Sequence, residues 1–417
     1  MNILVINQPL SNRGDESAHR ALIYSLLKSF PNASIKVLFL LKSESAVKAL
    51  KVDERVKYIN INSRHSFFLN NLLETAVYYN FYKILTFIHP SLSKMRKEFK
   101  NADVIINAPG GICMGGFQNW QHIYQLLIAK QLHKKIIYYS RSIGPFPTIT
   151  AKNRKFKKLC IELLKEFDFL SLRDNKSMKI ADELGLKYIP TVDTAFLTSP
   201  SENIIPYIPF GLSNQLYAVI VPNQLTWHFA FKDIPQQVID SFYVSIIRTL
   251  LNDYPSFKFI MLPQLFAKSN GDYSYFKNLA EQISSDRIFV LKDDLNSDIQ
   301  QSIINHAKFV IGARYHSIVF SINNATPFVS LTYEHKMSGL LSSLGLDNYS
   351  LDITNLRDIG SAEIIKTECI NKLSSVINKN IESYQIKAKN ISQECYDAFL
   401  KKRMTKKAKN SRFGLLF

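Results

Sequence analysis

Polar residues that could do chemistry follow several of the apolar runs that we predict to be strands. Four such segments stand out, at residues 12–16, 109–116, 173–174 and 312–317. In open α/β sheets the ligand binds outside the carboxyl ends of the strands. We therefore expect these four segments to contribute to one binding site.

Arg314 and His316 carry the sharpest chemical signal. They lie two residues apart at the end of an apolar run, which aims both side chains at a site rather than at a core. The planar guanidinium of Arg suits a carboxylate or phosphate. The His imidazole, with an ordinary pKa near 6.5, exchanges a proton at neutral pH. The spacing is equally compatible with a surface Arg and a His that is hydrogen-bonded to a neighbouring loop.

The other segments are more ambiguous. Glycines such as Gly14, Gly110 and Gly111 could bring backbone N–H groups and a helix N-terminus close to an anion. They match neither G-x-G-x-x-G nor a Walker A sequence, so tight turns explain them as well. Asp15 is either the N-cap of the helix that follows it or a hydrogen-bond partner for substrate hydroxyls. Arg141 either lines the site or forms a salt bridge.

The elements that must position these residues alternate between strands and helices, which predicts parallel sheets covered on both faces. The predicted strands are 3–6, 37–41, 56–61, 104–108, 136–140, 169–172, 217–221, 258–262, 288–291, 309–311 and 328–331. The predicted helices are 18–30, 153–166, 235–251, 273–283, 297–305 and 335–344. We predict two Rossmann-like doubly wound domains facing a cleft, at 1–200 and 215–350, with a linker at 201–214. Helices and a basic tail follow at 351–417.

Composition narrows the function classes. Lys and Arg number 52 against 34 Asp and Glu, an excess of 18 that favours an anionic partner: nucleic acid, membrane or a small substrate. The aromatic residues fall in predicted core strands and no nucleic-acid-binding module is present, which argues against nucleic acid. No histidine motif or D-x-D motif calls for a metal. The four cysteines lack C-x-x-C spacing, which favours free thiols in a reducing compartment.

Two segments bear on membranes. Met1–Asn7 lacks a basic leader, and no apolar run reaches the roughly 18 residues that span a bilayer, so we expect a cytoplasmic protein. Residues 67–88 are rich in aromatic and aliphatic side chains, and a buried helix pair explains them better than a helix lying in a membrane interface. The basic tail after residue 400 is either a solvated, partly disordered end or an attractant for anionic lipid.

The polar segments together resemble the polysaccharide pyruvyl transferase family. That family has a Gly-x-Arg-Leu-His strand end, a Pro about ten residues on and a Tyr-x-x-Lys. This sequence has Gly312-Ala313-Arg314-Tyr315-His316, then Pro327 and Tyr333-Glu334-His335-Lys336. Further matching pieces occur in order: Gly14-Asp15-Glu16, Pro109-Gly110-Gly111, Ile143-Gly144-Pro145, Ser171-Leu172-Arg173-Asp174 and Asp193-Thr194-Ala195-Phe196. The resemblance covers residues 1–346. It departs from the family at Tyr315, where Leu is usual, and at Arg141, where a small residue is common.

The resemblance implies a fold like that of the GT-B glycosyltransferases and transfer of a pyruvyl group from phosphoenolpyruvate, a co-substrate, without a cofactor. It implies that Arg173, Arg314 and Lys336 hold the donor, with Tyr315 beside them, and that His316 is the acid/base residue. We place Gly14, Asp15, Gly110 and Gly111 on the acceptor side.

The expected acceptor is a galactose-type sugar that receives a 4,6-ketal in a capsular or exopolysaccharide, or in its undecaprenyl-diphosphate-linked precursor. An anionic membrane surface is a second expected partner. The alternative function is a GT-B glycosyltransferase using a nucleotide sugar, although the carboxylate pair expected for the nucleotide ribose is missing.

Overall fold

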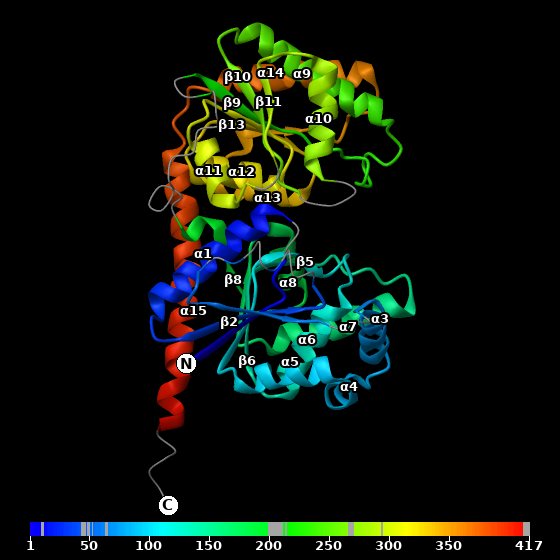
Figure 1. The fold of residues 1–417 in the computed structure, drawn as a ribbon, viewed down its shortest axis with the longest axis vertical. Helices are drawn as coiled ribbons and strands as arrows, with labels where there is room; N and C mark the ends of the chain where they lie inside the picture. Colours follow the sequence, from blue (N-terminus) through cyan, green and yellow to red (C-terminus); the bar gives the residue numbers. More distant parts are fainter. Residues whose placement is uncertain are drawn as a thin grey trace, which may run out of the picture. The chain divides into compact units, whose positions relative to one another are not determined.

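The computed structural model describes residues 1–9, 12–42, 47, 51, 53–62, 66–198, 212, 215–265, 271–292 and 295–411. The chain forms two compact units (Figure 1). The first comprises Met1–Leu10, Ala18–Leu197 and Ile391–Phe417, and the second comprises Ser11–Ser17 and Thr198–Asn390. The predicted linker 201–214 lies outside the described residues except for Leu212.

The first unit is built on one parallel sheet in the order β3-β2-β1-β4-β6-β7-β8, with β5 paired to β6. Its strands are β1 (Asn2–Ile6), β2 (Ser34–Leu40), β3 (Lys57–Ile61), β4 (Val104–Asn107), β5 (Gly110–Met114), β6 (Lys135–Ile143), β7 (Phe169–Leu172) and β8 (Ile189–Pro190). In β1, Ile3 and Val5 enter one core and Leu4 and Ile6 enter another. Both faces of this sheet are therefore buried, because successive side chains of a strand point to opposite faces.

Helices cover both faces of the first sheet. One core packs α3 (Ser66–Tyr78), α4 (Tyr82–Ile88), α5 (Pro90–Asn101), α6 (Trp120–Gln131) and α7 (Ala151–Glu166) against the sheet. The other core receives α1 (Arg13–Ser29) and the last part of α15 (Glu382–Ser411), through residues such as Leu22 and Phe399. The remaining helix of the described part of this unit is α8 (Asn175–Glu183).

The second unit has a parallel sheet in the order β11-β10-β9-β12-β13-β14. This is the 3-2-1-4-5-6 order of the Rossmann fold. Its strands are β9 (Tyr217–Val221), β10 (Lys258–Met261), β11 (Ile288–Val290), β12 (Val310–Gly312), β13 (Phe328–Thr332) and β14 (Ser350–Asp352). Its helices are α9 (Gln236–Asp253), α10 (Asp272–Ile283), α11 (Ser297–Asn305), α12 (Tyr315–Asn323), α13 (His335–Leu344) and α14 (Ile359–Val376), and Figure 1 shows them around the sheet. The prediction of two Rossmann-like doubly wound domains is confirmed.

The start of α1 differs from the prediction. The helix begins at Arg13, not at residue 18, because the Asn12 side chain caps it by accepting from the Asp15 N–H at 2.8 Å. Asp15 is therefore the third residue of the helix and not its N-cap. Asn12 also forms an antiparallel bridge with Leu265, and the Arg13 N–H donates to the Gln264 carbonyl at 3.1 Å. These backbone bonds explain why Ser11–Ser17 group with the second unit, although we assigned them to the first.

Two segments that carry predicted site residues are regular elements that the sequence did not predict. Gly110–Met114, expected as a glycine loop, is strand β5, in which Gly110 has a φ of 153°. A Cβ at Gly110 would lie 2.8 Å from Pro9 Cγ, so the absence of a side chain allows close packing there. Tyr315–Asn323, which we left without an element, is helix α12.

The C-terminal region 351–417 is not a separate unit. β14 is the last strand of the second sheet, and the second unit continues to Asn390. From Ile391 the chain belongs to the first unit, because residues such as Tyr396 and Phe399 of α15 are buried in its core. The helix runs to Ser411, so most of the predicted basic tail is helical, and residues 412–417 lie outside the described ones. None of the described helices combines the length and the apolar character that crossing a membrane requires.

The segment 67–88 forms a helix pair as predicted, α3 and α4, but the pair is not fully buried. Residues such as Leu69 and Leu73 enter the core, whereas Phe68 and Ile88 are 72% and 69% exposed. The prediction of a buried pair is wrong for the outer faces of both helices.

Candidate functional site

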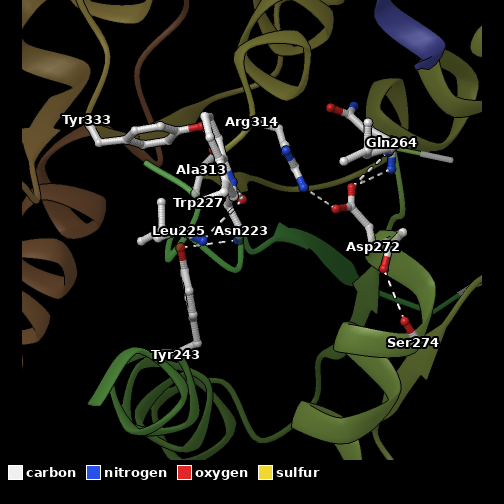
Figure 2. A network of polar contacts seen from close by, with 12 residues as sticks. Asn223, Leu225, Trp227, Tyr243, Gln264, Asp272, Ser274, Ala313, Arg314 and Tyr333 are labelled. Carbon is white, nitrogen blue, oxygen red and sulfur yellow. Dashed lines mark hydrogen bonds and ion pairs between the residues drawn. The ribbon is translucent and has the colours of Figure 1, made fainter. Parts of the chain in front are cut away.

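The second sheet reverses its strand order between β9 and β12, the place where Rossmann-like sheets bind ligands. Asn223 follows β9 and Arg314 follows β12. The Asn223 side chain links these strand ends: its Nδ2 donates to the Ala313 carbonyl at 3.4 Å and to the Tyr333 hydroxyl at 2.6 Å (Figure 2). Tyr333 follows β13, so the network joins three neighbouring strand ends.

Arg314 is held from one side by an ion pair with Asp272, the first residue of α10. Asp272 is 2% exposed, and its other carboxylate oxygen accepts from the N–H groups of Gln264 at 3.0 Å and Leu265 at 2.9 Å. Figure 2 shows the Arg314 guanidinium pointing toward the Asp272 carboxylate. Among the described residues, Nε of Arg314 has no hydrogen-bond partner. The Arg is thus fixed in direction and keeps a donor for a ligand.

Gln264 adds an unsatisfied amide to the same place. Its side chain is 3% exposed, and neither its Oε1 nor its Nε2 has a hydrogen-bond partner within the described part of the chain. Its backbone, by contrast, is engaged with Arg13 and Asp272. A buried polar group without a partner is costly and needs an explanation, and a bound ligand would supply one.

His316 lies in the first turn of α12, against the first turn of α1. A Cβ built on Gly14 would lie 1.8 Å from Cγ and Nδ1 of the His316 ring. Such a distance is impossible for a real side chain, so only glycine allows α1 to come this close to the imidazole. The sequence could not show this contact, which explains why the second residue of α1 is a glycine.

Tyr315 and Lys336 lie beside His316 in this site. The Tyr315 ring is buried, stands edge-on to the His316 ring, and has Nζ of Lys336 5.9 Å from its centroid. Lys336 pairs with Glu334 at 2.6 Å. The Tyr315 side chain is therefore a packing group between the His and the Lys.

An aromatic cluster adjoins the Asn223 network. Trp227 donates from its indole N–H to Asn223 Oδ1 at 3.2 Å and stands edge-on to Tyr333, yet it is 55% exposed. Burial lowers the pKa of His228, Lys336 lowers it further, and Glu334 opposes the shift. Burial raises the pKa of the Tyr333 hydroxyl, which therefore stays protonated at neutral pH.

The first unit holds the other predicted residues. Arg173 follows β7, is buried, and forms an ion pair with the fully buried Asp193, which also accepts from the Ala195 N–H at 3.0 Å. Gly110 and Gly111 lie in β5 of the same unit.

Arg141 is 1% exposed, and no described residue forms with it the salt bridge that was one of its two predicted roles. Its guanidinium donates to the carbonyls of Ala108 at 2.5 Å and Asn7 at 3.3 Å and to Sγ of Cys113 at 3.0 Å. The described residues offer it no carboxylate.

The second unit thus brings together most of the predicted site residues: Gly14, Asp15, Arg314, Tyr315, His316 and Lys336. Sequence reasoning missed Asn223, Gln264 and Asp272. Each follows the carboxyl end of β9 or β10, which was a usable signal, but a single amide or carboxylate there is too common to be singled out. In the described part of the chain, no group of three or more His, Cys, Asp or Glu residues is arranged to hold a metal ion.

Comparison with known proteins identifies the class. Residues 12–335 match the family described as polysaccharide pyruvyl transferase, which covers most of the 417 residues. The chain belongs to this family of transferase enzymes. It is also 24% identical to the amylovoran biosynthesis protein AmsJ of Erwinia amylovora, over 94% of this chain and 95% of that protein.

Solved structures support the fold alone. The UDP-GlcNAc 2-epimerase of Neisseria meningitidis superposes with a TM-score of 0.58 at 11% identity, over 97% of this chain and 100% of that one. A putative UDP-N-acetylglucosamine 2-epimerase of Listeria monocytogenes gives 0.55 at 10% identity, over 94% and 91%. Both likenesses agree with a GT-B-like pair of Rossmann domains.

Proposed function

We propose that this enzyme transfers the pyruvyl group of phosphoenolpyruvate onto two hydroxyls of one sugar, forming a cyclic ketal and releasing phosphate. The observation that carries the proposal is the arrangement around Arg314 and His316. An oriented guanidinium and an imidazole lie within two residues at the N-terminus of one helix, at the switch point of the sheet. Pyruvyl transfer needs both an anion site and a group that moves protons.

The donor carries a carboxylate and a phosphate, and the second unit supplies complementary groups. Arg314 keeps Nε for an anion while Asp272 holds its other edge. The N-terminus of α12 contributes the positive end of a helix dipole. The unsatisfied amide of Gln264 adds a donor, and Lys336 adds a point charge. Arg173 is assigned to the donor by family resemblance.

His316 is the proposed acid/base residue. A proton delivered to the donor's methylene carbon leaves an oxocarbenium ion at the central carbon. One sugar hydroxyl adds to that carbon and loses its proton, and the C–O bond to phosphate then breaks. The second hydroxyl attacks the resulting cation and loses its proton, closing the ketal. One proton is consumed at carbon and two are released, one of which leaves with phosphate. The reaction therefore balances with donor and acceptor alone, and general acid–base catalysis of this kind contributes about 10²–10⁴-fold.

For the acceptor we propose a galactose-type sugar modified at its 4 and 6 hydroxyls, within an exopolysaccharide or capsule precursor carried on undecaprenyl diphosphate. AmsJ, the amylovoran biosynthesis protein, supports the polysaccharide context. Asp15 is the proposed hydroxyl partner, and we keep Gly14, Gly110 and Gly111 on the acceptor side. A lipid-linked acceptor fits a cytoplasmic enzyme at the inner face of the membrane, with no nucleic acid or metal as partner.

Phosphate release from phosphoenolpyruvate tests the proposal, measured with and without a panel of lipid-linked and model β-galactosides. Release that depends on an acceptor and is lost in His316→Gln is the expected result. If no acceptor supports phosphate release, the shift in melting temperature on adding phosphoenolpyruvate or nucleotide sugars distinguishes the two functions. Stabilisation by phosphoenolpyruvate keeps the proposed donor, whereas stabilisation by nucleotide sugars alone refutes it in favour of a glycosyltransferase.

A further inference from the structure

Helices α3 and α4 of the first unit carry large apolar side chains on their outer faces. We call these residues the α3–α4 surface. They are Phe67, Phe68, Leu72, Tyr79, Ile84, Phe87 and Ile88, and their exposed fractions range from 39% to 73%. The two helices pack against each other in the first unit (Figure 1). Side chains of this size present on the order of several hundred Å² together, a size at which an exposed apolar patch is often functional.

The spacing of these residues turns them outward. Phe68 and Leu72 occupy positions i and i+4 of α3, which fall on one face of a helix, and Tyr79 directly follows the last residue of α3. Ile84, Phe87 and Ile88 do the same in α4 at i, i+3 and i+4. The opposite faces of both helices are buried in the core of the unit. Each helix is therefore apolar on two sides, although its core requires only one.

Positive charge accompanies the α3–α4 surface. Lys83 on α4 is exposed, and Arg96 of the adjoining α5 places its guanidinium 4.5 Å from the centre of the Phe87 ring. Three further lysines, at i, i+3 and i+6 of α5, are exposed: Lys94, Lys97 and Lys100.

Two carboxylates of this region are already paired with lysines. Glu74 pairs with Lys152, and Glu98 pairs with Lys36 at 2.7 Å. The basic residues therefore dominate the charge beside the apolar surface.

We propose that the α3–α4 surface docks the enzyme onto an anionic lipid membrane. The apolar side chains would enter the boundary between headgroups and acyl chains, and the neighbouring lysines would contact lipid phosphates. A second copy of the chain is a poorer occupant. A two-fold interface places the same patch on both sides, and would bring the lysines of the two copies together without a counter-charge. The inference does not depend on the reaction proposed above, because vesicle binding is measured without substrate.

Flotation of the full-length protein with lipid vesicles tests the proposal. The vesicles are either phosphatidylcholine alone or an equimolar mixture with phosphatidylglycerol. The protein should float with the anionic vesicles and less so as salt rises. The variant Phe68→Ser/Ile84→Ser/Ile88→Ser should lose at least roughly tenfold in partition coefficient, because it removes three large apolar side chains.

The matched control is Ile149→Ser/Ile364→Ser/Ile386→Ser, which removes three other apolar side chains that are 88%, 63% and 56% exposed. It should bind vesicles as the unmodified protein does. A second measurement does not depend on loss of binding. In Phe68→Trp the indole emission should shift to the blue when anionic vesicles are added, whereas Ile149→Trp should show no vesicle-dependent change.

Three results would overturn the proposal. The first is equal flotation of the serine variant and the unmodified protein. The second is a change in oligomeric state of the serine variant, by sedimentation velocity, with unchanged vesicle binding, since this would identify a contact between copies. The third is loss of binding on neutralising the basic residues after 400 together with no loss in the serine variant, which would assign membrane contact to the C-terminus.

Discussion

The replacement Gly14→Ala tests whether the contact between α1 and the His316 ring is part of the catalytic geometry. The new Cβ would lie 1.8 Å from Cγ and Nδ1 of the imidazole, whereas ordinary contact begins near 3.4 Å. The ring must therefore move by roughly 1.6 Å, the difference between these distances. Misplacing a catalytic group by about 1 Å can cost on the order of 10²-fold in rate.

The same replacement should not unfold the protein. Gly14 lies within α1 and its φ is not positive, so alanine suits the backbone and favours the helix by about 0.5–1 kcal/mol. His316 is partly exposed, so its ring can swing away from the new methyl group. We expect kcat to fall about 100-fold or more while the melting temperature stays within a few degrees of the original.

The assay is acceptor-dependent phosphate release, with thermal unfolding measured on the same samples. Gly360→Ala is the matched control, because Gly360 is likewise the second residue of a helix, α14, and a Cβ there lies at an ordinary contact distance of 3.5 Å from Asp358 Oδ1. The double variant Gly14→Ala/His316→Gln should be no slower than His316→Gln alone, since both act through one group. An unchanged kcat in Gly14→Ala would show that the position of this ring does not matter for the reaction.

Three further predictions concern other described residues. Asp272→Asn should raise KM for phosphoenolpyruvate about tenfold and lower the free energy of unfolding by about 1–3 kcal/mol, because Arg314 loses its counter-charge; an unchanged KM in steady-state kinetics would contradict this. Trp227→Ala should raise KM for the sugar acceptor about three- to tenfold and leave KM for the donor unchanged, if the half-exposed indole stacks on the sugar; equal effects on both would disprove stacking. Burial lowers the pKa of His19 from 6.5 to about 3. Below pH 6.5 the unfolded chain therefore binds a proton that the folded chain does not, and the free energy of unfolding decreases as the pH is lowered. His19→Gln should remove about 1 kcal/mol of the loss between pH 6.5 and 5.5 in denaturant titrations, and an identical loss would refute the assignment.

Much of the fold followed from periodicity. β7 and β9 match their predicted bounds because their side chains are buried on both sides, and an uninterrupted apolar run is typical of such strands. β5 was not predicted, because its glycines are typical of a turn. It is a strand only because it pairs with β6, and the sequence does not show this pairing. α12 was not predicted, because we interpreted its first residues, Tyr315 and His316, as site residues and not as the start of a helix.

The outward faces of α3 and α4 show the limit of composition. A segment rich in Phe, Leu and Ile predicts burial, since most such side chains are buried. Only the packed structure shows that one face of each helix suffices for the core, and that the other remains exposed.

By itself the sequence determined where polar chemistry can occur. The carboxyl ends of parallel strands share one edge of a sheet, so residues that follow apolar runs, such as Arg314 and His316, must converge there. The tertiary structure alone decided their partners. Asp272 contacts Arg314, and Gly14 contacts His316. The partners of each pair are far apart in the sequence, and local propensities do not predict contacts of this range. These contacts depend on which helix N-terminus packs against which strand end, and that is set by the burial of the whole core.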